Sequence, residues 1–477
     1  MNAVTQVPVA SASPERFREL LGGDFTQVEN AIQAAGRLLS GRVIWHVNST
    51  ARGGGVAEML QSLLSYARGS GVDVRWMTIA GDQEFFRVTK RIHNNLHGAP
   101  GDGGNLGRTE HKSYQRALME AAAELTRLVR DGDLVYLHDP QTAGLTPHIR
   151  SREVRVVWRC HVGLDRPNDL ARRAWGFLRP YLEEADAYVF SRPAFVWDGL
   201  DQEKLWLVAP SIDAFSPKNQ DLDPDVVRAI LAKVGLGEDG GSTPVFLRYD
   251  GSPARVNRHA EFDQDAPIPW RAPLLTQVSR WDRLKDPIGV IRCFAEHCKH
   301  PVAHLLLAGP SVADVADDPE GAEVLAAVRS QRDGLPAEVK ARTHLACLPM
   351  DDIQENAAMV NAIQRRSDVI VQKSLAEGFG LTVAEAMWKA KPVVASRIGG
   401  IQDQIVDDES GVLVDDPADL AEAGRAIDSL LADPVRAEAI GAAARERVRE
   451  QFLGTRHLVQ YMQLIERMLD RDGGRSG

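Results

Sequence analysis

Cysteine and long apolar runs are both scarce in this sequence of 477 residues. Its four cysteines form no CxxC pair and no spacing typical of zinc ligands. Thiols this sparse are typical of a reducing compartment. No apolar run approaches the roughly 20 residues that span a bilayer. The first residues also lack the basic and apolar regions of a signal peptide. We therefore expect a cytoplasmic protein that does not associate with membranes.

An excess of basic residues is also lacking. The chain carries 56 Lys and Arg against 66 Asp and Glu, a formal net charge of −10. This balance argues against a general nucleic-acid-binding surface, so we expect no nucleic-acid partner. An anionic substrate would have to be held by a few placed cations.

Several cofactor motifs are absent as well. The thirteen histidines form no HExxH, and there is no Walker A sequence. A dinucleotide fingerprint that began at Gly53 would need glycine where Glu58 stands. The segment Asp131–Asp133 resembles a DxD metal motif, but it precedes a predicted strand, so we interpret it as a turn. We expect neither a metal nor a resident cofactor.

Short apolar runs alternate with longer amphipathic stretches in two successive parts of the chain. This alternation predicts crossover units and parallel sheets, and the length exceeds what one hydrophobic core usually serves. We predict an α/β fold with two Rossmann-like, doubly wound domains. The predicted strands are 41–48, 72–79, 133–138, 154–160 and 187–190 in the first part, and 274–279, 303–308, 343–348, 369–372 and 392–396 in the second.

A segment rich in Pro, Ser and Asp at 205–215 marks the predicted boundary. We predict a first domain over 1–206, with an N-terminal helical extension, and a second domain over 207–455. Residues 456–477 would form a C-terminal helix and tail that packs back on the first domain. Residues 237–273 show no clear period and are interpreted as an insertion or a long loop.

Three loops at predicted strand ends carry the candidate chemistry, because ligands of open parallel sheets bind beyond the carboxyl ends of the strands. Gly54 and Gly55 precede a predicted helix, where glycines and free N–H groups suit an anion, although a tight turn is the alternative. Arg280 and Lys285 follow the strand 274–279. They could clamp a diphosphate, or they could pair with Asp282 and Asp286 in a solvated loop.

The third loop runs from Ser374 to Glu385 after the strand 369–372. Glu377 and Glu385 lie eight residues apart across a loop-to-helix turn, which can aim both carboxylates at one pocket. Carboxylates suit sugar hydroxyls, whereas amides at a helix start suit phosphate. Together they indicate a nucleotide sugar. A capping role remains the alternative for Glu385.

At this point the chain resembles a known family. The segment 377–385, EGFGLTVAE, has the E-x7-E arrangement of retaining glycosyltransferases with the two-Rossmann GT-B architecture. VSRWDRLKD at 278–286 looks like the donor-phosphate loop of the glycogen-synthase-like group (family 4 type). The segments 46–60, 89–94, 138–141 and 159–161 look like those of trehalose glycosyltransferring synthases, which join glucose from a nucleotide donor to free glucose.

The resemblance implies two domains that face each other across a cleft, and it implies a role for each matching residue. Arg280 and Lys285 would hold the donor diphosphate, and Glu385 the ribose. The donor sugar would be surrounded by Glu377 and the backbone of Gly378, Phe379, Gly380 and Leu381. In the first domain, the resemblance implies that the loop of Gly54 and Gly55 closes over the diphosphate and the acceptor. It also implies that His161 lies near the donor sugar and the reaction centre. Without the resemblance, the position of His161 at a strand end, with Arg159 before it, suits a core residue and a site residue equally.

The function implied is transfer of glucose from a nucleoside diphosphate to a sugar acceptor with retention, giving trehalose if the acceptor is glucose. A retaining trehalose phosphorylase that uses glucose 1-phosphate has similar motifs and stays open. An NAD-dependent dehydrogenase on the same Rossmann units is disfavoured by Glu58. The base of the donor and the identity of the acceptor are undecided by the sequence. So is the oligomeric state, for which a homodimer stays open.

Overall fold

A computed structural model describes residues 3–51, 54–150, 153–237, 241–312 and 319–473. The chain divides into two compact units. Unit 1 comprises Met1–Ser211 with Leu453–Gly477, and unit 2 comprises Ile212–Phe452. The boundaries expected from sequence were 206/207 and 455/456.

Unit 1 is built on a seven-stranded sheet with the order β1-β3-β2-β4-β5-β6-β7, in which only β1 runs antiparallel to its neighbour. The strands are β1 (Val4–Val7), β2 (Ile44–Asn48), β3 (Val74–Ile79), β4 (Leu134–His138), β5 (Arg155–Cys160), β6 (Ala187–Phe190) and β7 (Leu205–Leu207). The helices are α1 (Arg18–Leu21), α2 (Phe25–Leu38), α3 (Gly55–Gly69), α4 (Gln83–Leu96), α5 (Arg108–Leu128), α6 (Asp139–Thr142), α7 (Thr146–Ile149), α8 (Asp169–Leu182) and α18 (Gly454–Gly473).

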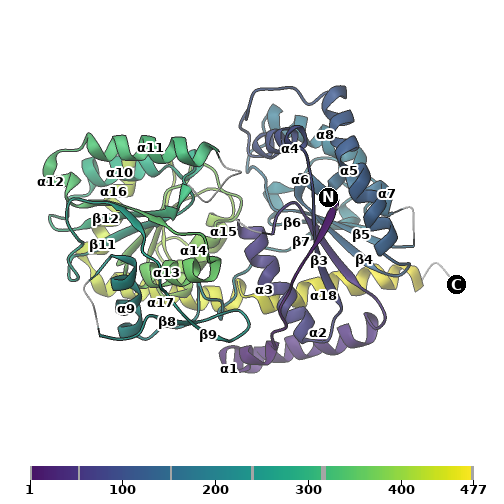
Figure 1. Cartoon of the computed structure of the whole chain (residues 1–477), viewed down its shortest axis with the longest axis horizontal. Helices are drawn as coiled ribbons and strands as arrows, with labels where there is room; N and C mark the ends of the chain where they lie inside the picture. Colours follow the sequence, from purple (N-terminus) through teal and green to yellow (C-terminus); the bar gives the residue numbers. More distant parts are fainter. Residues whose placement is uncertain (1–2, 52–53, 151–152, 238–240, 313–318, 474–477) are drawn as a thin grey trace. The chain divides into compact units, whose positions relative to one another are not determined.

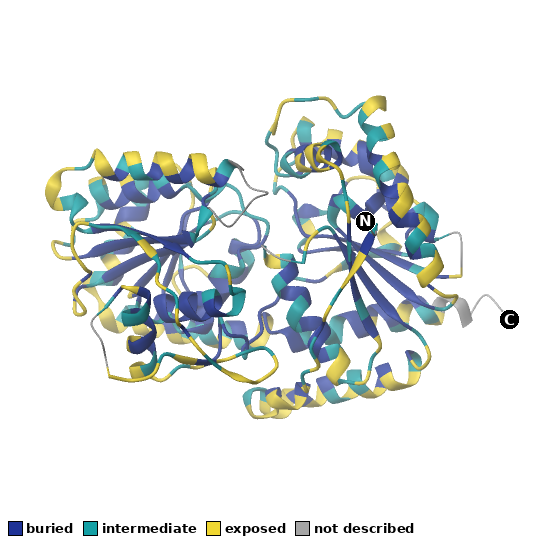
Figure 2. Ribbon diagram, in the orientation of Figure 1, coloured by how far each residue is buried: buried dark blue, intermediate teal, exposed yellow. Residues whose placement is uncertain are grey.

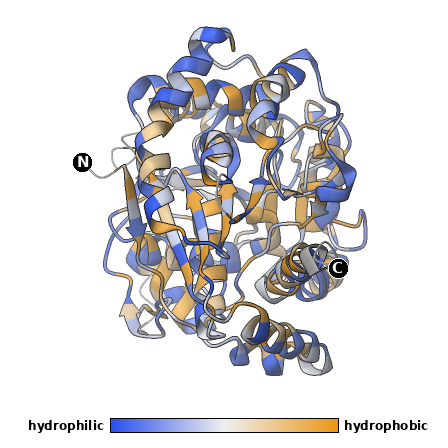
Figure 3. Cartoon of the chain, turned by 90° about the vertical axis from the view of Figure 1, so that its right-hand side faces the viewer, coloured by the Kyte–Doolittle hydropathy of each residue, from blue (hydrophilic) through white to orange (hydrophobic). Residues whose placement is uncertain are grey.

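Helices cover both faces of this sheet, which explains why its central strands read as continuous apolar runs. Side chains of α4, α5 and α8 form one core with the sheet, and those of α2, α3 and α18 form a second. The central strands β2, β4 and β6 are accordingly buried (Figure 2), and Figure 3 shows hydrophobic residues along the strands. The C-terminal helix α18 packs against α2 and α3 (Figure 1).

Unit 2 is built on a second seven-stranded sheet, with the order β10-β13-β12-β11-β14-β15-β16. The strands are β10 (Glu261–Asp263), β11 (Leu274–Val278), β12 (His304–Pro310), β13 (Thr343–Leu348), β14 (Val369–Gln372), β15 (Val393–Ser396) and β16 (Val412–Val414), beside a hairpin of β8 (Val245–Leu247) and β9 (Pro253–Arg255). The helices are α9 (Pro224–Val234), α10 (Pro287–His297), α11 (Pro319–Asp333), α12 (Ala337–Lys340), α13 (Ile353–Arg366), α14 (Leu381–Trp388), α15 (Ile401–Gln404), α16 (Leu420–Ala432) and α17 (Pro434–Gln451).

Strand order fixes where each unit can bind a ligand. In unit 2 the six parallel strands follow the order 3-2-1-4-5-6 along the chain, so the order reverses between β11 and β14. In unit 1 the parallel order is 2-1-3-4-5-6, and the reversal falls between β2 and β4. Crossover connections leave to opposite sides at such a point, which opens a crevice at the carboxyl ends of the strands.

The prediction of two doubly wound domains is confirmed, but two segments differ from their expectation. Residues 237–273 contain the β8–β9 hairpin and β10, which pairs antiparallel with β13 and forms the edge of the sheet. Strands of three residues are too short to show a period, so only a loop or an insertion could be predicted here. The C-terminal helix predicted within 456–477 is α18, which begins at Gly454 and follows α17 after Phe452 and Leu453. Of the described residues, no helix is long and apolar enough to cross a membrane.

The turn expected at Asp131–Asp133 is confirmed. The buried carboxylate of Asp133 accepts hydrogen bonds from the backbone N–H of Val43 (2.8 Å) and Arg130 (3.0 Å) and from the indole of Trp45 (2.9 Å). It lies at the amino end of β4, opposite to the carboxyl ends where ligands bind. Asp133 therefore joins β2 to β4 and is not placed to hold a metal.

We expect Asp133→Asn to lower the stability of unit 1 by about 2 kcal/mol, because an amide N–H₂ would replace an oxygen that accepts from buried donors. Asp131→Asn is the matched control, since Asp131 is exposed two residues away. Calorimetry should show a lower melting midpoint for the first variant alone. Equal midpoints would contradict the structural role.

Candidate active site

Two loops meet at the reversal point of the unit 2 sheet. Lys285, on the loop after β11, forms an ion pair with Glu377, on the loop after β14. Ser374 donates to the same carboxylate at 3.5 Å, and the backbone N–H of Leu375 donates to the carbonyl of Leu284 at 2.7 Å. The two predicted site residues are therefore in contact, at the place where the strand order favours a ligand.

Local hydrogen bonds fix the loop that carries Lys285. The Asp282 carboxylate caps the single turn 283–285 by accepting from the N–H of Leu284 at 2.8 Å. Gln277, on β11, donates to the carbonyl of Lys285 at 2.7 Å. Asp286 then adopts a left-handed φ of 50° and caps α10. A loop held at both ends presents its cation in one place, as charge recognition requires.

Arg280 begins this loop and is half-exposed, with its guanidinium 3.5 Å from Asp282. Its neighbour Trp281 is buried and donates to the carbonyl of Pro310 at 2.8 Å. The alternative of a solvated loop, in which the two cations pair with Asp282 and Asp286, describes Arg280 correctly, because Arg280 pairs with Asp282. It is wrong for Lys285, whose carboxylate partner is Glu377, whereas Asp286 pairs with Lys373.

The glycine loop is shaped by close backbone contacts. Gly380 has a φ of +83° directly before α14 begins at Leu381, a conformation that favours glycine. The N–H of Gly400 donates to the carbonyl of Gly378 at 3.0 Å, and a Cβ at Gly399 would lie 1.8 Å from the carbonyl oxygen of Glu377. The start of α14 thus lies beyond the carboxyl end of β14, where the N–H groups of a first helical turn suit a phosphate.

Glu385 lies one turn into α14 and is buried. Its carboxylate is 3.6 Å from the ammonium of Lys218. Lys389 donates to the carbonyl of Glu385 and to the side chain of Asn219, both at 3.0 Å. Burial lowers the pKa of Lys389 well below the usual value for lysine, against the opposing attraction of Glu385. The capping alternative for Glu385 does not hold, because Gly380 is the N-cap residue.

In unit 1 the predicted glycine loop follows β2. Gly54 has a φ of +136° and precedes α3, which begins at Gly55. A Cβ at Gly54 would meet no atom within 4 Å, so backbone conformation and not crowding calls for glycine there. Gly53 lies outside the described residues. The loop occupies the carboxyl end of β2, on one side of the reversal point.

His161 belongs to a buried chain of three side chains on the other side of that reversal point. Asp139 follows β4 with a left-handed φ of 64°. Its carboxylate accepts from the His161 backbone N–H at 2.8 Å and from His161 Nδ1 at 3.0 Å. Arg159 Nε donates to His161 Nε2 at 3.2 Å. Both ring nitrogens of His161 are therefore engaged by protein groups.

The protonation states follow from burial and contact. Burial lowers the pKa of His161 and outweighs the attraction of Asp139. Burial would raise the pKa of Asp139, but the His161 contacts lower it below its usual value. At neutral pH we therefore assign an ionised Asp139 and a neutral His161, with its proton on Nδ1. A neutral ring can accept from Arg159 at Nε2, as the geometry requires.

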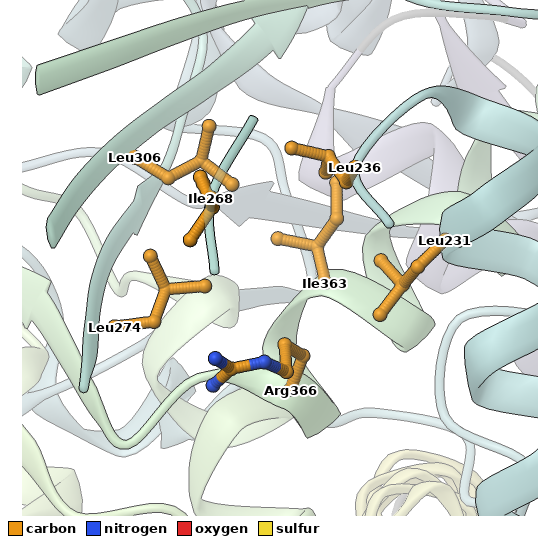
Figure 4. Close-up of a pocket in the computed structure, with 7 residues that line it drawn as sticks. All are labelled: Leu231, Leu236, Ile268, Leu274, Leu306, Ile363 and Arg366. Atoms are coloured by element: carbon orange, nitrogen blue, oxygen red, sulfur yellow. The ribbon is translucent and has the colours of Figure 1, made fainter. Parts of the chain in front are cut away.

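Neither sheet end offers an evident cation site. Over the ranges that the structure describes, no three His, Cys, Asp or Glu side chains gather as metal ligands would. A small cavity in unit 2, about 260 Å³ with the solvent-open space at its mouth included, is lined by five apolar side chains, by Leu274 at the start of β11, and by Arg366 (Figure 4). It lies at the amino end of that strand, away from the loops of Lys285 and Glu377.

Sequence reasoning missed two parts of these sites. Asp139 stands directly after a predicted strand and could have been found from that position alone. The Gly399–Gly400 turn and Gln404, which donates to the carbonyl of Gly380 at 3.3 Å, follow β15 and support the glycine loop. These residues support the glycine loop through tertiary contacts, which the sequence does not reveal. The paired glycines are the one signal that the sequence offers.

Comparison with known proteins agrees with this geometry. Residues 46–197 match the family model "Trehalose synthase, N-terminal domain", and residues 259–447 match "Glycosyl transferases group 1". The chain is 36% identical over 454 residues to a trehalose synthase of Pyrococcus horikoshii, covering 94% of this chain and 95% of that protein. It is 29% identical to a trehalose phosphorylase of Pleurotus pulmonarius, covering 87% of this chain but 55% of that protein.

Solved structures are similar in fold. An α,α-trehalose-phosphate synthase (UDP-forming) from Burkholderia xenovorans, in complex with glucose-6-phosphate, aligns with a TM-score of 0.65 at 14% identity. The alignment covers 89% of this chain and all of that one. The fold is therefore GT-B, and the chain belongs to the trehalose synthase family of GT-B glycosyltransferases.

Proposed function

We propose that the protein transfers glucose from a nucleoside diphosphate glucose to a sugar acceptor with retention at the anomeric carbon. The acceptor we propose is glucose, and the product trehalose. Unit 2 binds the donor and unit 1 the acceptor. The reaction needs no metal, because cationic side chains and helix N–H groups take the place of a cation.

The observation that carries this proposal is the contact of Lys285 with Glu377 at the reversal point of the unit 2 sheet. A donor sugar carries hydroxyls beside a diphosphate, so its site needs an acceptor carboxylate next to a cation. The loops supply both, together with the free N–H groups at the start of α14.

The chemical step follows from these groups. The bond between the anomeric carbon and the diphosphate oxygen breaks, and the acceptor hydroxyl oxygen bonds to that carbon on the same face. The acceptor proton passes to the departing phosphate oxygen, so no protein nucleophile is required. Lys285 and Arg280 offset the charge that grows on the diphosphate, and Glu377 holds the sugar in place.

In unit 1 we propose that the Asp139 carboxylate accepts a hydrogen bond from an acceptor hydroxyl. Asp139 Oδ2 is aligned by His161, and Arg159 holds the imidazole in the tautomer that donates to it. Since both nitrogens of His161 are engaged by Asp139 and Arg159, His161 acts through Asp139 in this state. Its role is positioning.

A donor and acceptor panel tests the proposal. UDP-, ADP- and GDP-glucose and glucose 1-phosphate are each incubated with glucose or other sugars, and products are identified by mass spectrometry. A disaccharide formed from a nucleotide glucose only when acceptor is present supports it. A disaccharide formed from glucose 1-phosphate alone would instead indicate a phosphorylase, the class of the Pleurotus relative.

Activity should survive chelation. If Arg280 and Lys285 neutralise the departing diphosphate, EDTA will leave the initial rate unchanged. The measurement is the rate of nucleoside diphosphate release before and after dialysis against EDTA. Complete loss of activity with recovery in Mn²⁺ would contradict the proposal.

Removing either cation should slow turnover with little effect on folding. Arg280→Ala or Lys285→Ala should lower kcat at least ~10²-fold, the scale for removing one preorganised charge-stabilising group. Arg283→Ala is the matched control, because Arg283 lies on the same loop but is exposed and pairs with Glu320 and Glu323. A folded double variant, Arg280→Ala with Lys285→Ala, that turns over at the wild-type rate would refute the assignment.

Substitutions of Glu377 and Glu385 should affect different kinetic constants. Glu377→Gln should lower kcat at saturating donor, since its contact would strengthen as positive charge develops on the sugar. Glu385→Gln should chiefly raise the donor KM, since a contact equal in ground and transition states affects binding alone. Steady-state kinetics on variants with unchanged melting midpoints test this difference. A raised donor KM for Glu377→Gln with a lowered kcat for Glu385→Gln would exchange the two roles.

A further inference from the structure

The segment that opens unit 2 brings a lysine to the helix of Glu385. Residues 213–223 precede α9 and contain no helix or strand. From this segment, the ammonium of Lys218 lies 3.6 Å from Oε1 of Glu385. Both side chains are largely buried, since that of Lys218 is 16% exposed and that of Glu385 is 4% exposed. Charges shielded from water in this way interact more strongly than a pair on the surface.

Hydrogen bonds on both sides of Lys218 hold its backbone in place. The buried amide of Asn361, on α13, donates to the carbonyls of Pro217 at 3.1 Å and Gln220 at 2.9 Å. The Gln220 side chain donates to the carbonyl of Leu247 at 2.8 Å and accepts from its N–H at 2.9 Å. Leu247 belongs to β8, so the β8–β9 hairpin fastens this segment as well. The ammonium of Lys218 is therefore presented from a fixed backbone.

A second lysine, Lys389, stands at the end of α14 and holds the backbone instead. Its ammonium donates to the carbonyl of Glu385 and to Oδ1 of Asn219, both at 3.0 Å. These bonds join α14 to the segment that carries Lys218. The two lysines therefore differ, because Lys389 binds neutral oxygens whereas Lys218 faces the Glu385 carboxylate.

We propose that Lys218 is a positioning residue of the donor site. It offsets the charge of the buried Glu385 carboxylate and holds that carboxylate in one orientation. Glu385 can then accept hydrogen bonds from the two adjacent hydroxyls of a ribose. The donor so selected is a ribonucleotide, because a sugar without those hydroxyls offers Glu385 no hydrogen-bond donor. The inference rests on the proposed function, in which Glu385 contacts the donor nucleotide.

The effect of Lys218 should pass through Glu385. A buried carboxylate that loses its cation takes up a proton more readily, and it is free to turn toward another donor. Either change makes it a poorer acceptor for the ribose hydroxyls. A substitution of Lys218 should therefore weaken the binding of nucleotides that carry these hydroxyls and spare those that lack them. General damage to the site would weaken both alike.

Titration calorimetry on the full chain tests this inference. UDP, ADP and GDP are titrated first, and the tightest binder is compared with its 2′,3′-dideoxy analogue. We expect the wild type to bind the analogue about tenfold more weakly, since hydrogen bonds to a charged group are lost. Lys218→Met should raise the Kd of the natural diphosphate about tenfold and that of the analogue less than about twofold. Lys218→Arg, which keeps the charge, should stay within about threefold of the wild type.

Further variants separate a role through Glu385 from a role in folding. In a chain that carries Glu385→Gln, Lys218→Met should cause no additional loss of affinity, because both changes act on one contact. Lys299→Met is the matched control, since Lys299 is exposed and precedes β12, at the amino end of the sheet. Melting midpoints establish that each variant is folded, and Lys218→Gln replaces Lys218→Met if the latter does not fold.

The same titrations distinguish this inference from the proposed function. If none of the three diphosphates binds to the wild type, both are wrong. If one of them binds, equal affinity of the wild type for the dideoxy analogue would overturn the inference alone. So would an unchanged Kd in Lys218→Met, an equal loss for both ligands, or a loss that adds in full to that of Glu385→Gln.

Discussion

Strands of a parallel sheet all end at one edge, and the proposed donor site depends on this constraint. In unit 2 it brings the loop after β11 next to the loop after β14, although 92 residues separate Lys285 from Glu377. Their ion pair joins two connections that leave toward opposite faces of the sheet. The pair is partly buried, so the two charges interact more strongly than they would on the surface. A cation and a carboxylate fixed side by side are what a diphosphate and a sugar require.

In unit 1 the common edge of the parallel strands likewise brings side chains together, here into a chain of hydrogen bonds. Asp139 and His161 follow the neighbouring strands β4 and β5, and Arg159 precedes His161 by two residues on β5. The three form one chain of hydrogen bonds, in which Arg159 donates to His161 and His161 donates to Asp139. The left-handed backbone of Asp139 is the strained point, and its two hydrogen bonds to His161 hold it there. A neutral histidine is what the buried guanidinium beside it favours.

Strands and the loops that follow them could be predicted from the sequence, because both depend on the pattern of apolar residues along the chain. Strands such as 187–190, 343–348 and 369–372 were predicted with the bounds that the structure shows, because buried parallel strands are continuous apolar runs. The loop of Lys285 and the loop of Glu377 were likewise found from their place after strands. Their mutual contact was not predictable, because the pairing of β11 with β14 depends on the order of strands in the sheet. The strands β8, β9 and β10 were missed because three residues show no period. The functional roles of all the site residues, those of Lys285 and Glu377 included, stay predictions.

The measurement that tests the account most directly is a crystal structure with a nucleoside diphosphate glucose bound. The account predicts that the diphosphate lies beside Lys285, Arg280 and the start of α14, with donor atoms about 3 Å from its oxygens, and that the sugar lies against Glu377. A diphosphate bound elsewhere, with the Lys285–Glu377 pair left without ligand, would contradict the assignment of unit 2 as the donor site.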